Sequence, residues 1–412
     1  MISGRNNKKV SLSNEKTRRR FWLVNAFISL FSRLTRFKRK PNIWVFGCWE
    51  GRRYDDNSKY LFEYILKNEP SITPFWITRS KEVQQKVSAS GKPILLSEDK
   101  EAKRIMKKAG VAFYTNGLDD FSNYCYVKGA LIIDLNHAPI GVKEVSYYNY
   151  KSCFFLKRWL KQLKRFLFDW FYFDYAIVTS DKCESFWKRA FSLDNSKKLL
   201  RVKGLPRYDT LLLNKQEKKE NDIKTILYLP TYRRYDNSVV NNVFASISDD
   251  EEFKSVLKEK RAKIIIKPHF EDFFVHEDKN KSTCVELMPP NSILSTQELL
   301  SISDCLITDY SSCCVDFSIL SRPIVFYTPD FDKYSADNGI SEEFKDFFSV
   351  IETQYDVESL KKRLVKIIED NFSNNNESLT LDRMFNGSSK QNNHHPFCQE
   401  VTNLIKSKVK NI

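Results

Sequence analysis

Polar residues follow several short apolar runs in this 412-residue chain, and these runs have the composition of buried parallel strands. The clearest is the run 305–308, which residues 309–312 (DYSS) follow before apolar side chains recur at helical spacing over 313–320. Asp309 or Ser311 is the expected N-cap of that helix. Backbone N–H groups at such a turn bind anions, and serine hydroxyls add donors. These residues therefore indicate either a phosphate site or an ordinary capped helix.

A histidine occupies a second loop of this kind. His137 follows the apolar run 131–135 and stands between Asn136 and Ala138. A histidine on a loop is more often structural than catalytic, but open α/β sheets bind their ligands beyond the carboxyl ends of the strands. Both a structural role and a functional role are therefore open for His137.

Cationic side chains stand beside or after other apolar runs, namely Arg207, Arg233, Lys267 and His269. A guanidinium can hold a phosphate through two parallel hydrogen bonds. For Arg207 the alternative is a structural ion pair with Asp209, two residues further along the chain.

Apolar runs alternate with helical patterns along most of the chain, which indicates parallel sheets joined by crossover helices. The charged stretch 214–222 is the expected interdomain linker. The expected segments are a basic amphipathic segment over 1–41, an N-terminal Rossmann-like domain over 42–213, a C-terminal Rossmann-like domain over 223–370, and a tail with a helix over 371–412. Residues 235–250 are expected to form an irregular loop and residues 371–393 to be loose. A helix predicted over 357–369 is expected to cross back to the first domain.

The net charge of +15 points to an acidic partner such as anionic lipid, a phosphate polymer, a nucleotide or nucleic acid. Two amphipathic segments, 21–40 and 154–173, place apolar faces beside basic residues. Each can lie on an anionic membrane or pack against the protein. The apolar run 21–31 is too short to span a bilayer and lacks a small-residue cleavage site, so we expect no signal peptide. The nine cysteines form no C-x-x-C pair and no Cys/His cluster, which suits a reducing compartment and indicates no metal site.

Taken together, these segments resemble the CDP-glycerol glycerophosphotransferase family, which includes primases and polymerases of teichoic acids and related capsule polymers. The resemblance covers roughly residues 43–345. It rests on ITDYSS, the Asp316-Phe317 pair and RPIVFYTPDFDKY, and on the Gly51 loop with residues 52–61, the His137 loop, GLPRYD, YLPTYRR and KPH. The chain departs from the family pattern at Asn136 and Ala138, and at the proline between Lys267 and His269.

The resemblance implies an α/β fold of two Rossmann-like domains facing a cleft (GT-B type), with basic amphipathic helices. An acceptor hydroxyl would attack the glycerol-bearing phosphorus of CDP-glycerol or another CDP-alditol, and CMP would leave. In this interpretation His137 is the general base and His269 is a second catalytic residue. The implied substrate-binding residues are Arg207, Arg233, Lys267, Asp309, Ser311, Ser312 and Asp316. For the segment 51–61, acceptor binding and simple helix capping both stay open.

The implied acceptor is lipid-linked or polymeric, and the protein is expected to bind the cytoplasmic face of the cell membrane peripherally. No metal or other cofactor is expected, because cationic side chains can neutralise the phosphate charge. Nucleic acid is not an expected partner, while an oligomer is possible. Two alternatives are a GT-B glycosyltransferase that uses a nucleotide sugar and a non-enzymatic basic protein that binds membrane or nucleic acid.

Overall fold

The computed structural model describes residues 38–122, 124–145, 172–193, 195–217, 223–233, 238–268, 284–289, 295–387 and 396–409. Nearly all of the two predicted amphipathic segments, and His269, lie outside these ranges. Contacts divide the chain into two compact units. The first comprises residues 1–137, 148–177 and 401–412, and the second comprises residues 138–147 and 178–400. The boundaries between the two units thus fall after residues 137, 147, 177 and 400. The linker at 214–222 stays a prediction.

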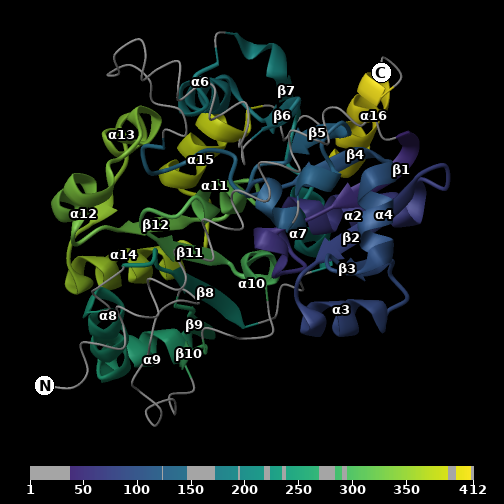
Figure 1. Ribbon diagram of the computed structural model, residues 1–412. Coiled ribbons are helices and arrows are strands. Elements are labelled where there is room, and N and C mark those ends of the chain that lie inside the picture. The colour runs from purple at the N-terminus through teal and green to yellow at the C-terminus, as the bar shows by residue number, and fades with distance from the viewer. Residues whose placement is uncertain are drawn as a thin grey trace, which may run out of the picture. The chain divides into compact units, whose positions relative to one another are not determined.

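The first sheet has seven strands in the order β3-β2-β1-β4-β5-β6-β7 (Figure 1). In chain order they are β1 (Lys40–Phe46), β2 (Thr73–Thr78), β3 (Ile94–Leu96), β4 (Ala109–Tyr114), β5 (Leu131–Asp134), β6 (Tyr175–Val178) and β7 (Leu199–Arg201). Helices α2 (Asp56–Asn68), α3 (Lys81–Ser88) and α4 (Lys100–Lys108) connect the first four strands. Phe46 and Phe113 stack at 4.6 Å between ring centroids and are fully buried. Burial on both faces explains why these strands are continuous apolar runs and do not alternate.

The second sheet has six parallel strands in the order β10-β9-β8-β11-β12-β13. They are β8 (Lys224–Leu229), β9 (Ala262–Ile266), β10 (Val285–Leu287), β11 (Cys305–Thr308), β12 (Ile324–Tyr327) and β13 (Thr353–Gln354). Helices α8 (Ser238–Ser248), α9 (Glu251–Glu259) and α14 (Val357–Glu369) share one apolar core with these strands. The further helices of this unit are α6 (Asp181–Ala190), α7 (Tyr208–Glu217), α10 (Thr296–Ile302), α11 (Cys313–Ser318), α12 (Phe331–Asn338), α13 (Glu342–Phe348) and α15 (Asn376–Leu381).

Both sheets contain the strand order of a Rossmann fold. Counted from its first strand, each sheet has the order 3-2-1-4-5-6, which a seventh strand extends in the first sheet. The order reverses between β1 and β4 in one sheet and between β8 and β11 in the other. Ligands of such sheets bind at this reversal, beyond the carboxyl ends of the strands. The predicted α/β class with two Rossmann-like sheets is confirmed, while the cleft between the domains stays a prediction.

Three local predictions were wrong. Residues 235–250 contain helix α8, whose buried Val240, Val243, Phe244 and Ile247 have helical spacing. Residues 371–393 contain α15 and a π-helical turn at Asp382–Asn386, so this segment is not loose throughout. Helix α14 packs within the second unit, through Leu360, Leu364, Ile367 and Ile368. Polar residues conceal the apolar face in the first two cases, since Asn and Ser make up much of both segments.

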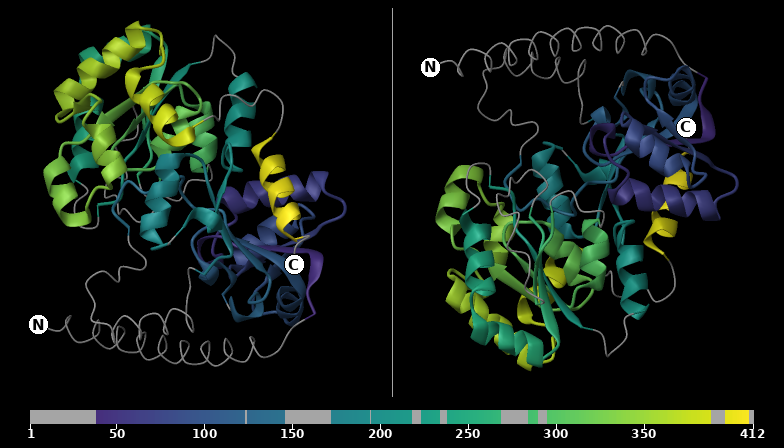
Figure 2. Two further views of the ribbon diagram at one scale, coloured as in Figure 1. Left: turned by 90° about the horizontal axis from the view of Figure 1, so that it is seen from above. Right: turned by 90° about the horizontal axis from the view of Figure 1, so that it is seen from below.

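The helix that returns to the first unit is α16 (Phe397–Val409), whereas the sequence predicted this for α14. Its residues from Val401 onward belong to the first unit, where Val401 and Ile405 are fully buried and Lys406 donates to Glu69 at 2.9 Å. In Figure 2 the yellow α16 lies beside the purple and blue elements of that unit in both views. The first unit therefore joins distant parts of the sequence.

Candidate functional site

His137 projects from the loop that follows β5. Asn136 adopts a left-handed conformation (φ 53°), which Asn tolerates better than most residues because its side chain can bond locally. Its backbone N–H donates to Asp134 Oδ1 at 2.8 Å and its side-chain amide donates to the carbonyl of Ile177 at 2.6 Å. These bonds fix the turn, so the position of the next residue, His137, is set by the backbone.

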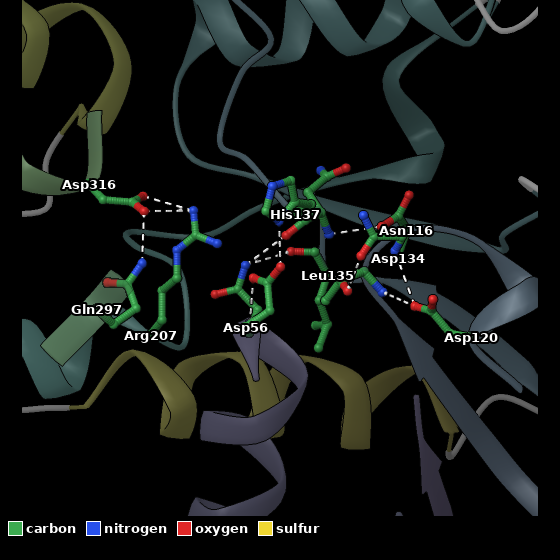
Figure 3. Close-up of polar contacts among 12 residues, drawn as sticks. Asp56, Asn116, Asp120, Asp134, Leu135, His137, Arg207, Gln297 and Asp316 are labelled. Atoms are coloured by element: carbon green, nitrogen blue, oxygen red, sulfur yellow. Dashed lines mark hydrogen bonds and ion pairs between the residues drawn. The ribbon is translucent and has the colours of Figure 1, made fainter. Parts of the chain in front are cut away.

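An aspartate at the start of α2 holds the imidazole. Asp56 Oδ2 lies 2.5 Å from His137 Nδ1 (Figure 3), and the Asp56 side chain is 3% exposed while that of His137 is 45% exposed. Asn57 joins the same helix start to the loop, because its amide donates to the carbonyls of Leu135 and Asn136 at 3.2 and 2.7 Å. In the tautomer whose Nδ1–H donates to the carboxylate, Nε2 carries the lone pair of the ring and is the nitrogen that can accept a proton.

The pairing of Asp56 with His137 was not predicted, since Asp56 was considered only for helix capping or acceptor binding. Asp56 is 81 residues away from His137 in the sequence. The available signal was that a short acidic residue follows β1 closely, at the same edge of the sheet as the histidine. Strand β4 lies between β1 and β5, and the carboxyl ends of these parallel strands lie at the same edge of the sheet, where loops from both can meet.

The loop after β1 also contacts the imidazole. Trp49, Glu50 and Gly51 all have positive φ (47°, 54° and 72°). The Trp49 ring meets the His137 ring edge to face at 4.5 Å, and the Arg53 guanidinium lies 5.2 Å from the Trp49 ring centroid. The tryptophan thus restricts the imidazole on a side that Asp56 leaves open.

A buried carboxylate holds this strained loop in place. Asp120 accepts the backbone N–H groups of Glu50, Thr115 and Asn116 at 2.7, 3.0 and 3.2 Å. Burial nevertheless raises the pKa of Asp120 to about 7. A side chain at Gly47 would meet Asp120 at 2.8 Å, so the close approach of the two segments requires glycine there.

In the second unit, Arg233 lies between two carboxylates. Its Nη1 donates to Asp309 at 2.7 Å, and its Nε and Nη2 donate to Asp330 at 2.7 and 3.0 Å. The Arg233 side chain is only 7% exposed. Burial lowers the pKa of Arg233, but the hydrogen bonds and charges of Asp330 and Asp309 outweigh it and raise the pKa further above its usual range. Because most of its donors are used, Arg233 is better placed to fix the loops after β8 and β11 than to bind phosphate.

Both N-cap predictions for α11 were wrong, because the structure places neither Ser311 nor Asp309 at that position. The Oδ1 of Asp309 accepts the backbone N–H groups of Thr231 and Tyr310 at 2.9 and 2.6 Å, and the residue is fully buried. Ser312 occupies the N-cap position without a side-chain capping bond, while Ser311 Oγ accepts the N–H of Cys313 at 3.4 Å. Helix α11 has only six residues, so its dipole adds little. The Ser312 hydroxyl is half-exposed and forms no hydrogen bond within the described part of the chain.

Arg207 and Asp316, which were both predicted to bind substrate, form a buried ion pair. Arg207 Nη2 lies 2.8 Å from Asp316 Oδ2, with side chains 4% and 3% exposed. Gln297 donates to the same carboxylate at 3.1 Å (Figure 3). The alternative partner, Asp209, accepts the first N–H groups of α16 at 2.7 and 2.9 Å. The structure thus surrounds Arg207 and Asp316 with protein.

Of the remaining predicted residues, Lys267 is half-buried at the carboxyl end of β9, where its N–H donates to the carbonyl of Tyr228 at 3.0 Å. His269 lies outside the described residues. Within the described ranges, no group of three or more His, Cys, Asp or Glu side chains is placed to hold a metal ion. No described helix is long and apolar enough to cross a membrane.

Comparison with known proteins supports the resemblance seen in the sequence. The CDP-Glycerol:Poly(glycerophosphate) glycerophosphotransferase family matches residues 29–400. A teichoic acid poly(glycerol phosphate) polymerase of Staphylococcus epidermidis is 25% identical over 331 residues, which are 73% of this chain and 42% of that protein. A teichoic acid glycerol-phosphate primase of Bacillus subtilis is 28% identical over 257 residues, which are 61% of this chain and 63% of the primase. The chain thus matches about half the length of these relatives.

The fold has a solved counterpart. The structure of the wall teichoic acid polymerase TagF matches with a TM-score of 0.66 at 19% identity, over 98% of each chain. At that identity the likeness concerns the fold.

Proposed function

The chain belongs to the CDP-glycerol:poly(glycerophosphate) glycerophosphotransferase family, and on this premise we propose that it transfers glycerol phosphate from CDP-glycerol to a hydroxyl of a polymeric or lipid-linked acceptor. The observation that carries the proposal is the imidazole of His137, half-exposed and held by the buried carboxylate of Asp56. Such a pair is suited to remove the proton of an attacking hydroxyl.

In the proposed reaction, His137 Nε2 takes the proton from the acceptor hydroxyl while Asp56 stabilises the imidazolium that forms. The acceptor oxygen bonds to the phosphorus that carries glycerol, and the bond from that phosphorus to the bridging oxygen breaks. The electron pair of this bond leaves with CMP. Charge grows on the equatorial oxygens and on the departing phosphate, so hydrogen-bond donors and cations must surround them.

We assign the binding of the donor phosphates to the second unit. Lys267 supplies a cation at the end of β9, and Ser311 and Ser312 supply hydroxyls after β11. Arg233 and Asp309 act by fixing these loops. With cationic side chains in this role, we propose that the transfer needs no metal ion.

Anionic membrane contact is also part of the proposal. The segment 1–41 carries twelve Lys and Arg residues against one acidic residue, and each basic residue adds about 1 kcal/mol near an anionic surface. A polymer acceptor anchored at the cytoplasmic face would be within reach of a peripherally bound enzyme. Flotation with phosphatidylglycerol vesicles, compared with phosphatidylcholine vesicles, tests this part by itself. Equal recovery with both vesicles would reject the proposed attraction to anionic lipid.

The transferase activity is tested by CMP release. We would supply CDP-glycerol, CDP-ribitol and UDP-N-acetylglucosamine in parallel, each with a synthetic lipid-linked glycerol-phosphate acceptor. CMP release with a CDP-alditol that depends on the acceptor supports the proposal. Release of UDP alone would favour a glycosyltransferase, and no release from any donor would contradict both.

A further inference from the structure

The charges around Arg233 in the second unit bear on how that unit could bind a diphosphate. Arg233 contributes one positive charge and is bonded to two carboxylates, Asp309 and Asp330. With the two acids ionised, this buried cluster is negative overall. A negative cluster repels a diphosphate, so the donor requires positive charge from nearby side chains.

Lys143 lies beside this cluster. Its ammonium is 5.4 Å from the centroid of the Tyr334 ring, and Tyr334 stacks on Tyr310 at 3.8 Å. The Tyr310 hydroxyl in turn donates to Asp330 at 3.1 Å. Lys143 therefore rests on an aromatic pair that borders the Arg233 cluster.

The backbone that carries Lys143 is firmly held. The carbonyl of Val142 accepts the N–H of Ser341 at 2.8 Å, and the carbonyl of Gly141 accepts the Ser341 hydroxyl at 2.9 Å. The Val142 side chain is 3% exposed. A long side chain on such an anchored segment loses less freedom when it binds a ligand than one on a mobile loop.

Within the described ranges, no carboxylate lies at hydrogen-bond or ion-pair distance from the Lys143 ammonium, although the charge of Asp309 acts on it from further away. The ammonium forms no hydrogen bond and no ion pair with any residue of those ranges, although the side chain is half-buried. Burial lowers the pKa of Lys143, and the charge of Arg233 adds to this while Asp309 opposes it. A half-buried cation without an acceptor is costly unless a ligand supplies the anion.

Buried hydroxyls around the cluster also lack partners. Tyr228, Thr328 and Tyr334 are each at most 4% exposed, and their hydroxyl groups form no hydrogen bond within the described structure. Burial and then the charge of Asp309 raise the pKa of both tyrosines, which places them near the cluster. Unpaired buried donors of this kind are rare in folded proteins and are consistent with a polar ligand at the site.

We propose that the Lys143 ammonium binds a phosphate of the donor diphosphate, beside the Tyr310–Tyr334 pair. The inference rests on the proposed function and adds a residue that the predicted binding set lacks. Lys143 follows His137 by six residues, so one short segment would supply both the base and a phosphate ligand.

The test is CDP binding by calorimetry with Lys143→Gln, Lys143→Arg and the control Lys345→Gln. Lys345 is an exposed lysine of α13 in the same unit, so the control makes the same change in charge. Losing a hydrogen bond to a charged group predicts about ten- to a hundredfold weaker CDP binding for Lys143→Gln. The arginine variant should recover part of this loss, and the control should bind as the wild type does. In CMP release, Lys143→Gln should mainly raise the KM for CDP-glycerol.

Unchanged CDP affinity in Lys143→Gln, with a lower melting temperature, would overturn the inference and leave Lys143 as a counter-charge for the two aspartates. The proposed function would survive that result, because the wild type would still bind CDP and release CMP. A wild-type protein that neither binds CDP nor releases CMP would reject the proposed function and this inference together.

Discussion

The pairing of Asp56 with His137 predicts a specific loss on replacing Asp56 by asparagine. Asparagine has nearly the same shape and tolerates the positive φ of this position (63°), so the backbone should be preserved. The variant removes a 2.5 Å hydrogen bond to a carboxylate that is 3% exposed. A hydrogen bond to a charged group contributes about 1.5–3 kcal/mol, which corresponds to a rate loss of about ten- to a hundredfold.

The amide introduced by Asp56→Asn can also reverse the tautomer of the imidazole. If this amide donates to His137 Nδ1, the proton of the neutral ring moves to Nε2, and Nε2 is then no longer a base. We therefore expect the larger loss, about a hundredfold in kcat, with little change in the KM for CDP-glycerol. Asp99→Asn is the matched control, because Asp99 is an exposed acid before α4 in the same unit and makes no side-chain capping bond.

The assay is CMP release by the single variants and by the double variant with His137→Ala. Removal of a general base typically costs about 10²–10⁴ in rate. If Asp56 acts through the imidazole, adding Asp56→Asn to His137→Ala should lower the remaining rate less than about twofold. Independent, multiplying losses with unchanged melting temperatures would refute the reasoning, as would full activity of Asp56→Asn.

Three further predictions concern a buried ion pair, a buried carboxyl group and the need for a metal ion. Arg207→Met should lower the free energy of unfolding in urea by about 3–5 kcal/mol, since it leaves the Asp316 carboxylate buried and unpaired. The double variant with Asp316→Leu should recover part of this loss. A single variant as stable as the wild type would contradict the predicted contribution of this ion pair. Burial raises the pKa of Asp134 to about 8. The native state therefore holds a proton that the unfolded state releases from about pH 4 upward. Because of this difference, the free energy of unfolding should fall by up to about 1.4 kcal/mol per pH unit until about pH 8. Urea titrations of Asp134→Asn, which keeps the acceptor for the Asn136 N–H, should lack this component. CMP release should persist in EDTA, and a loss restored by Mg²⁺ would reject metal independence.

The sequence predicted the sheets well because a strand buried on both faces is a continuous apolar run. Strands β5 and β11 lie within a residue of their predicted runs. Helix α8 escaped prediction because Asn and Ser interrupt its apolar spacing, and only packing against the second sheet distinguishes it from a loop. Such burial is a tertiary property that local composition does not contain.

The candidate site was predicted less completely. The position of His137 beyond β5 follows from the strand pattern, but its partner Asp56 depends on which loops meet at the edge of the sheet. For Arg207 and Arg233 the residue types indicated phosphate binding, whereas their burial beside Asp316 and Asp309 decides what they contact. The charge of an arginine is evident in a sequence, but whether a carboxylate already occupies its donors is not.

Helix α16 has a consequence for biosynthesis. Val401 and Ile405 complete the packing of a unit whose first strand begins at Lys40. Chains emerge from the ribosome N-terminus first, at about 5–20 residues per second. The surface that these two side chains cover must therefore stay exposed to water for tens of seconds while the whole second unit is translated. This exposure makes the nascent first unit a target for chaperones that bind apolar surface.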